Sequence, residues 1–219
     1  MRALQTGAPI GNSGARASEF PVLRITNRHV SAQICLPDTE CGYYRGTRFD
    51  WSGIVRDLRS RGHRYVSEWQ SRHDPLRHDG LTGPADEFTQ IGYEQARPGE
   101  EFLKIGVGTL RKPYDQPYDR FRLYEIVDPG IRDLIASRDR VEFRHRMLND
   151  HYGYDYRKTL VLTDAPGLRL EYTLKNLGPA PLTGYVYNHN FFTLDRMATG
   201  PDTSIHFPFE PEGTWREAY

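Results

Sequence analysis

The sequence has no excess of charge of either sign and no long apolar run. Lys and Arg together number 29, as do Asp and Glu, so the formal net charge of the 219 residues is zero. A balanced chain has no net attraction for nucleic acid or for an anionic membrane surface. No stretch approaches the ~20 consecutive apolar residues of a transmembrane helix. Nucleic-acid binding and membrane insertion are therefore not expected.

Cysteine is also scarce, and only Cys35 and Cys41 occur, separated by "LPDTE". A reduced pair is the simplest interpretation, while a disulfide across a small loop stays open. Two thiols alone make a poor metal site. Residues 1–19 have no apolar segment of the kind found in secretion signals, and we expect them to be a disordered leader to a domain over 20–219. These features predict a cytoplasmic protein.

Aromatic residues are abundant, with 14 Tyr and 10 Phe, and such residues favour strands. Apolar and polar residues alternate in "DRVEFRHRM" (139–147) and in "GLRLEYTLKN" (167–176). In the first, one face carries Val141, Phe143, His145 and Met147. Alternation of this kind is typical of half-buried antiparallel strands. Weaker runs of the same type occur at 22–26, 30–36, 102–110, 121–127, 159–163 and 182–187. Short strands separated by turn signals predict an all-β sandwich or barrel.

Helical patterns are nearly absent. "WSGIVRDLRSRG" (51–62) is the best candidate, and it suits a pair of strands equally well. The stretch from about 63 to 100 is rich in His, Asp, Gly, Pro and Glu and is predicted to be one long loop. Long ordered loops in compact domains are usually functional.

Arginine is interleaved with aromatic residues in "CGYYRGTRFDWSG" (41–53), which contains Arg48 and Trp51. Aromatic rings can stack on a sugar, and the guanidinium group can hydrogen-bond the sugar hydroxyls. A hairpin that buries its aromatic residues in the core explains the composition equally well.

Two His–Asp pairs, His73-Asp74 and His78-Asp79, occur in "SRHDPLRHDGLTGPADEF" (71–88). A carboxylate beside a histidine can fix its tautomer for metal binding or acid–base chemistry. The spacing matches no zinc pattern, so a polar loop that reaches into a cleft is favoured, and neither a metal nor a cofactor is expected. The glycines of "KIGVGTL" (104–110) are not followed by a helical pattern, which excludes a dinucleotide site.

Polar residues interrupt an otherwise apolar strand in "YVYNHNFF" (185–192). Alternation places His189 with Tyr187 and Phe191 on one face and Asn188 on the other. Buried polar groups cost free energy unless each finds a partner. A hydrogen-bonded core histidine and a proton donor aimed by a rigid strand both remain open.

"NHNFFTLD" (188–195) resembles the Asn-His-x-(Tyr/Phe)-Phe-x-Leu motif of aldose 1-epimerases. The segments "GYYRGTRFDWSG", "GPADEF" and "GYDYRKTL" are similar to a divergent bacterial branch of the galactose mutarotase-like superfamily. The resemblance covers about residues 20 to 210 and implies an antiparallel β-supersandwich with an open sugar-binding groove. It also implies interconversion of the anomers of a free aldose, in which a histidine protonates the ring oxygen and a base deprotonates the anomeric hydroxyl.

By this resemblance His189 matches the catalytic acid, and Asn188 positions it or binds substrate. Arg48 resembles a substrate-binding arginine of the family. His78 lies where a second sugar-binding histidine is expected, and Trp51 would line the same groove. The ligand would be a mono- or oligosaccharide.

The base of the family is a glutamate far downstream of the histidine motif, and no glutamate after His189 lies in that context. We therefore expect a supersandwich that is incomplete at its C-terminal end, with open sheet edges through which a homodimer could form. A non-catalytic carbohydrate-binding domain that uses the same groove is the alternative function. A related lyase or hydrolase partner is a third, because one fold hosts many chemistries.

Overall fold

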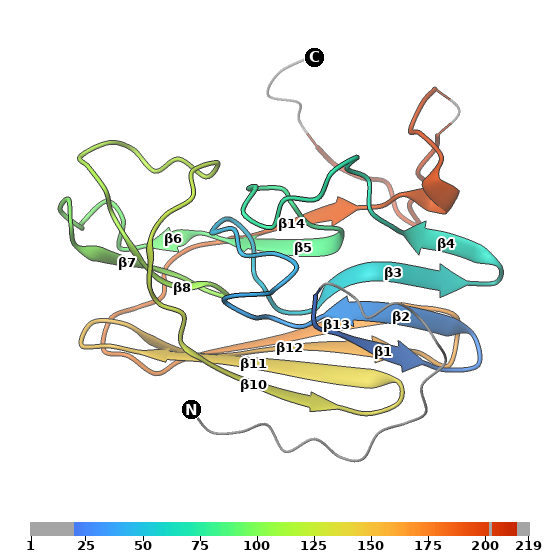
Figure 1. Cartoon of the computed structure of the whole chain (residues 1–219), viewed down its shortest axis with the longest axis horizontal. Helices are drawn as coiled ribbons and strands as arrows, with labels where there is room; N and C mark the ends of the chain where they lie inside the picture. Colours follow the sequence, from blue (N-terminus) through green and yellow to red (C-terminus); the bar gives the residue numbers. More distant parts are fainter. Residues whose placement is uncertain (1–19, 202, 214–219) are drawn as a thin grey trace.

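The computed structural model describes residues 20–201 and 203–213, and the elements of this part of the chain are almost all antiparallel strands (Figure 1). The leader expected at 1–19 lies outside the described residues. The N-terminal sheet consists of β1 (Val22–Thr26), β2 (Val30–Cys35), β3 (Ile54–Ser60) and β4 (His63–Val66). The long sheet consists of β10 (Ile131–Ala136), β11 (Arg140–Leu148), β12 (Gly153–Leu162) and β13 (Leu168–Asn176).

Two smaller sheets complete the architecture. The small sheet consists of β6 (Gln90–Ile91), β7 (Glu101–Lys104), β8 (Gly108–Arg111) and β9 (Ile126–Asp128). Far apart in sequence, β5 (Gly83–Phe88) and β14 (Val186–Phe191) form a two-stranded sheet, the β5–β14 pair. A short 3-10 helix, η1 (Leu194–Arg196), follows β14.

The long sheet is the lower layer in Figure 1, and the other sheets lie above it. One buried cluster joins the N-terminal sheet to the long sheet, and includes Ile25, Ile34, Val55, Val141 and Leu160. A second cluster joins the small sheet to the long sheet, and includes Leu103, Ile105, Met147, Tyr154 and Tyr156. The all-β, antiparallel prediction is confirmed, and the layering is that of a sandwich.

The alternation predicted for β11 is confirmed. Val141, Phe143, His145 and Met147 are all buried on the inner face, whereas Glu142, Arg144 and Arg146 are not. The same alternation is weaker along β13, where Leu168 and Leu170 are half-buried but Tyr172 and Leu174 are exposed. Within the described residues β13 pairs on one side only, with β12, so its other edge is open.

The predicted loop from about 63 to 100 is not a single loop, because it contains β4, β5 and β6. The run 102–110 is a hairpin of two strands rather than one strand. Gly106 turns the chain there with φ 81°, and a Cβ at this position would lie 2.4 Å from Asp50 Oδ1. The helix candidate at 51–62 forms β3, the alternative that its pattern also allowed.

Cys35 and Cys41 are free thiols, the first buried and the second exposed. Burial raises the pKa of the Cys35 thiol to about 12, which makes it unreactive. Within the described residues, no helical segment has the length and apolar character needed to cross a membrane.

Buried His145 generates a pH prediction. Its Nε2 donates to the carbonyl of Pro129 (2.9 Å), and its Nδ1 lies 3.0 Å from the Tyr154 hydroxyl. Burial, together with the charge of Arg132, lowers the pKa of His145 from 6.5 to about 2. The unfolded chain therefore binds a proton below pH 6.5 that the folded chain does not, and stability falls as the pH is lowered from 6.5.

We expect His145 to lower the free energy of unfolding by about 1.4 kcal/mol for each pH unit by which the pH falls between pH 6 and pH 5. Urea denaturation across this range should give a flatter profile for His145→Gln than for the wild type. The same change at exposed His151 is the control and should leave the slope unaltered. Parallel profiles for His145→Gln and the wild type would show that the buried imidazole does not set this dependence.

Candidate functional site

The β5–β14 pair has two chemically different faces. Its register places His189 opposite Ala85, Asn188 opposite Asp86, and Tyr187 opposite Glu87. Side chains directly opposite each other in an antiparallel pair project to the same face, and successive residues alternate. His189 and Glu87 therefore share one face, while Asn188 and Asp86 share the other.

His189 is half-buried and held by aromatic rings. Its imidazole stacks on Phe191 at 3.9 Å between ring centroids, and the ring of Phe49 lies edge-on at 6.2 Å. The imidazole nitrogens make no hydrogen bond to any of the described residues, so they are free to bind a ligand. Burial and the charge of Arg48 lower the pKa of His189, while Glu87 and Asp79 act in the opposite direction.

A buried ion pair lies beside His189. Arg48, from the loop between β2 and β3, donates from Nε to Glu87 Oε2 over 2.8 Å, and both residues are buried. The guanidinium carbon lies 4.5 Å from the centroid of the Phe49 ring, which is the ring that also contacts His189. Arg120 approaches the other oxygen of Glu87 at 3.6 Å. The carboxylate of Glu87 is thus enclosed by two guanidinium groups.

His78 also lies next to Arg48. Its Nδ1 lies 3.5 Å from Arg48 Nη1, and its ring contacts Phe121 at 4.8 Å. The structure therefore brings together three of the predicted site residues, His189, Arg48 and His78, although they come from three separate segments of the chain.

Asn188 has a different environment from His189. Its amide donates to Asp86 Oδ1, which also accepts from the Tyr172 hydroxyl at 3.2 Å. Asp86 forms a 2.7 Å ion pair with Lys158 of β12, and both side chains are 1% exposed. Asn188 therefore supports this buried pair from the face opposite His189, and it does not point into the same space.

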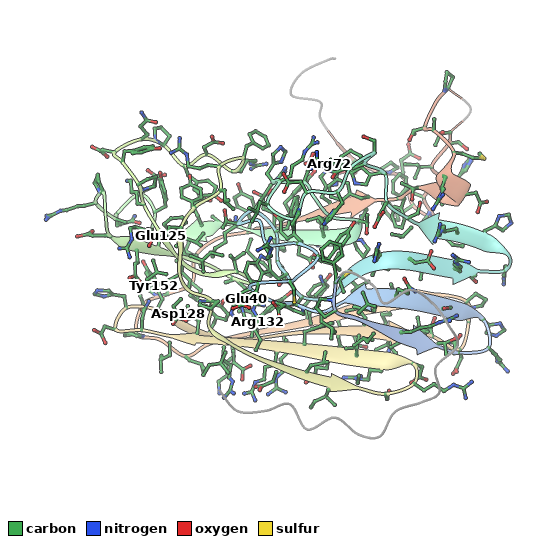
Figure 2. All side chains as sticks on the ribbon, in the orientation of Figure 1. Glu40, Arg72, Glu125, Asp128, Arg132 and Tyr152 are labelled. Atoms are coloured by element: carbon green, nitrogen blue, oxygen red, sulfur yellow. The ribbon has the colours of Figure 1, made fainter. Side chains whose placement is uncertain are left out.

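The buried pair belongs to a larger ionic network in the interior. Lys158 Nζ lies 3.8 Å from Asp50 Oδ2, which accepts a hydrogen bond from the Tyr156 hydroxyl at 3.0 Å. Arg132 of β10 lies between the long sheet and the segments above it (Figure 2), where it donates to the Gly106 carbonyl over 2.8 Å. Burial raises the pKa of Asp50, and the charges of Lys158 and Arg132 oppose this rise.

Trp51 is a core residue. Only 1% of it is exposed, its indole N–H donates to the Gly46 carbonyl over 2.7 Å, and Arg132 covers its ring at 5.0 Å. No face of the ring is open to a sugar, so the structure does not place Trp51 at the groove. The other aromatic residues of 41–53 are equally buried, as expected of a segment that supplies core side chains.

Sequence reasoning missed Glu87, Asp86 and Lys158 as partners of the site. Asp86 and Glu87 fall in the stretch that the sequence predicts to be one long loop, because nothing in "GPADEF" indicates that it pairs with a strand about a hundred residues later. The His–Asp pairs do not form a metal site. His73 bonds the Tyr43 carbonyl at 2.7 Å, and no cluster of three His, Cys, Asp or Glu residues in the described ranges could hold a metal ion.

Opposite charges near His189 allow its surroundings to be tested. Glu87→Gln should lower the pKa of His189, because it removes the nearby negative charge, and Arg48→Met should raise it, because it removes the positive charge. An NMR titration of the imidazole, assigned with His189→Gln, measures both shifts. Arg157→Met, an exposed change on the other side of the long sheet, is the control. Shifts of the same sign in the two test variants would contradict the geometry.

Comparisons of the chain with protein-family models, with curated proteins and with solved structures find no match. The functional interpretation therefore depends on the residues around His189 and on the motif in which this histidine lies.

Proposed function

We propose that this chain is a carbohydrate-active domain of the galactose mutarotase-like kind, in which an aldose binds on the His189 face of the β5–β14 pair. The observation that carries the proposal is the imidazole of His189, which is rigidly held by Phe191 and Phe49 yet has no hydrogen-bond partner among the described residues. An imidazole that is partly exposed, has no internal hydrogen-bond partner and is held by a strand is suited to the role of proton donor. The motif around His189 supports the same role.

In the proposed reaction, protonated His189 gives its proton to the ring oxygen while a base removes the proton of the anomeric hydroxyl. The bond between C1 and the ring oxygen breaks, C1 becomes a carbonyl carbon, and reclosure on the other face gives the other anomer. The reaction breaks and re-forms one C–O bond, moves two protons and involves no net oxidation or reduction, so it needs no redox cofactor. Arg48 and His78 offer nitrogen atoms beside His189 that could bind sugar hydroxyls.

A second candidate is a non-catalytic carbohydrate-binding domain, and one observation favours it. Glu87 is the carboxylate that shares the face of His189, but Arg48 and Arg120 enclose it. Because its oxygens already contact guanidinium groups, this carboxylate is not free to accept the proton of the anomeric hydroxyl. The same face would then bind a sugar without opening its ring.

Two further proposals concern the cellular location and the oligomeric state of the protein. Free Cys35 and Cys41 suit a reducing compartment, and we place the protein in the cytoplasm on this ground. The open edge of β13 leaves backbone groups available for pairing with a second copy, which supports a homodimer.

Polarimetry separates the two candidate functions. On freshly dissolved α-D-glucose and α-D-galactose, the wild type should accelerate mutarotation, and His189→Gln should reduce the catalysed rate by about 10²- to 10⁴-fold. Because the proton donor is the imidazolium form and its pKa lies below the usual 6.5, the rate should rise as the pH falls toward 6. His151→Gln, at an exposed turn, is the matched control.

Binding of either sugar without faster mutarotation would exclude the catalytic function and leave the binding domain. Equal rates for the wild type and His189→Gln would remove His189 from the role of proton donor.

A further inference from the structure

An open groove of about 670 Å³ begins directly beyond His189 along β14. One wall is formed by the segment that follows β4, with Glu68, Trp69 and Gln70, and the other by the end of β14 and the residues after it. His189 itself does not line the groove, but its neighbours Asn190 and Phe191 do. The volume lies in the range of about 300–1,000 Å³ that is typical of ligand sites.

Trp69 presents an oriented aromatic surface in this groove. Its indole N–H donates to the Leu81 carbonyl over 3.0 Å, and its ring is nearly parallel to that of Phe191, at 5.8 Å and 9°. Phe191 in turn stacks on His189 at 11°. The three rings therefore lie nearly parallel in a row that leads from His189 into the groove. Trp69 is nevertheless 42% exposed, so part of a ring that is already fixed in orientation faces solvent.

The two walls are fastened to each other. Ser67 N donates to Thr193 Oγ1 over 2.7 Å, and Thr193 N donates to the Tyr65 carbonyl over 3.1 Å. Asp195 of η1 binds His63 and the backbone N–H of Arg64, each at 2.7 Å. A groove whose two walls are joined by hydrogen bonds is already formed before a ligand arrives, which lowers the entropic cost of binding.

The chemistry of the lining fits a pyranose ring. The C–H bonds on one face of a pyranose carry a slight positive charge, which the negative face of an indole attracts, and the hydroxyls project around the rim of the ring. Carboxylate, amide and guanidinium groups surround Trp69, from Glu68, Gln70, Asn190 and Arg196. Such groups can donate to hydroxyls and accept from them.

We propose that the Trp69 groove is a second sugar subsite, and that the ligand of this protein is a reducing di- or oligosaccharide rather than a single aldose. The reducing ring would lie at His189, and the ring linked to it would stack on Trp69. This inference rests on the proposed function, because it assigns the first ring to the His189 face. It goes further in assigning a substrate class and a residue that selects it.

Calorimetry with matched sugars tests the subsite. D-glucose is compared with maltose, cellobiose and lactose, which all have glucose at the reducing end, and D-galactose is compared with 4-O-linked galactobiose. At least one disaccharide should bind about tenfold or more tightly than its monosaccharide. Trp69→Ala should abolish that difference and leave monosaccharide affinity within about twofold, whereas Trp69→Phe should retain part of it. Tyr114→Ala, at an exposed tyrosine remote in sequence from both walls, is the control.

The outcomes distinguish this inference from the proposed function. If monosaccharides bind or mutarotate in a way that depends on His189, but no disaccharide binds more tightly, the subsite is refuted and the proposed function stands. The subsite is also refuted if Trp69→Ala weakens mono- and disaccharides equally. If none of these sugars binds, both proposals are overturned.

Discussion

The structure depends on an ion pair that is almost completely removed from water, the pair of Asp86 on β5 and Lys158 on β12. Burying a single unpaired charge costs several kcal/mol, so each of these residues is tolerated only with its partner in place. A two-stranded sheet is marginally stable by itself. The β5–β14 pair therefore needs anchors to the long sheet, and this ion pair supplies one at the middle of β12, between the residues that β12 contributes to two of the apolar clusters. The register of β14 on β5 then determines which side chains of β14 face the long sheet.

The same attachment separates the side chains of the buried ionic network from those of the candidate site. On β5, Asp86 points toward the long sheet and Glu87 toward Arg48, so two adjacent carboxylates serve opposite faces. On β14, Asn188, which is itself exposed, donates to Asp86 of the buried network, whereas half-buried His189 lies on the opposite face. Asn188 thus gains a hydrogen bond to Asp86, whereas the imidazole nitrogens of His189 have no hydrogen-bond partner among the described residues. A strand that is pinned on one face can aim a group on the other face with little freedom.

Sequence patterns predicted the fold class and the core face of β11, because alternation reports directly on which side of a strand is buried. The assignment of Arg48, His78 and His189 to one site came from the resemblance to aldose 1-epimerases and not from these patterns. They failed for β5, where Asp86 and Glu87 give a polar pattern. Both carboxylates are neutralised by partners that no local pattern reveals, Lys158 and Arg48. They failed for Trp51 as well, since composition does not say which face of an aromatic-rich segment meets water. The hairpin at Gly106 was missed because the apolar run continues through the turn.

Hydrogen exchange measured by mass spectrometry tests most directly whether the Asp86–Lys158 pair holds the site in place. In Lys158→Met, we predict faster amide exchange in peptides that cover 83–88 and 186–191, with exchange in β11 and β12 close to that of the wild type. The double variant Asp86→Asn/Lys158→Met should recover much of the lost protection, because residue 86 then no longer carries a buried charge without its partner. Unchanged protection of 186–191 in Lys158→Met would contradict the account, and so would an equal loss of protection throughout the long sheet.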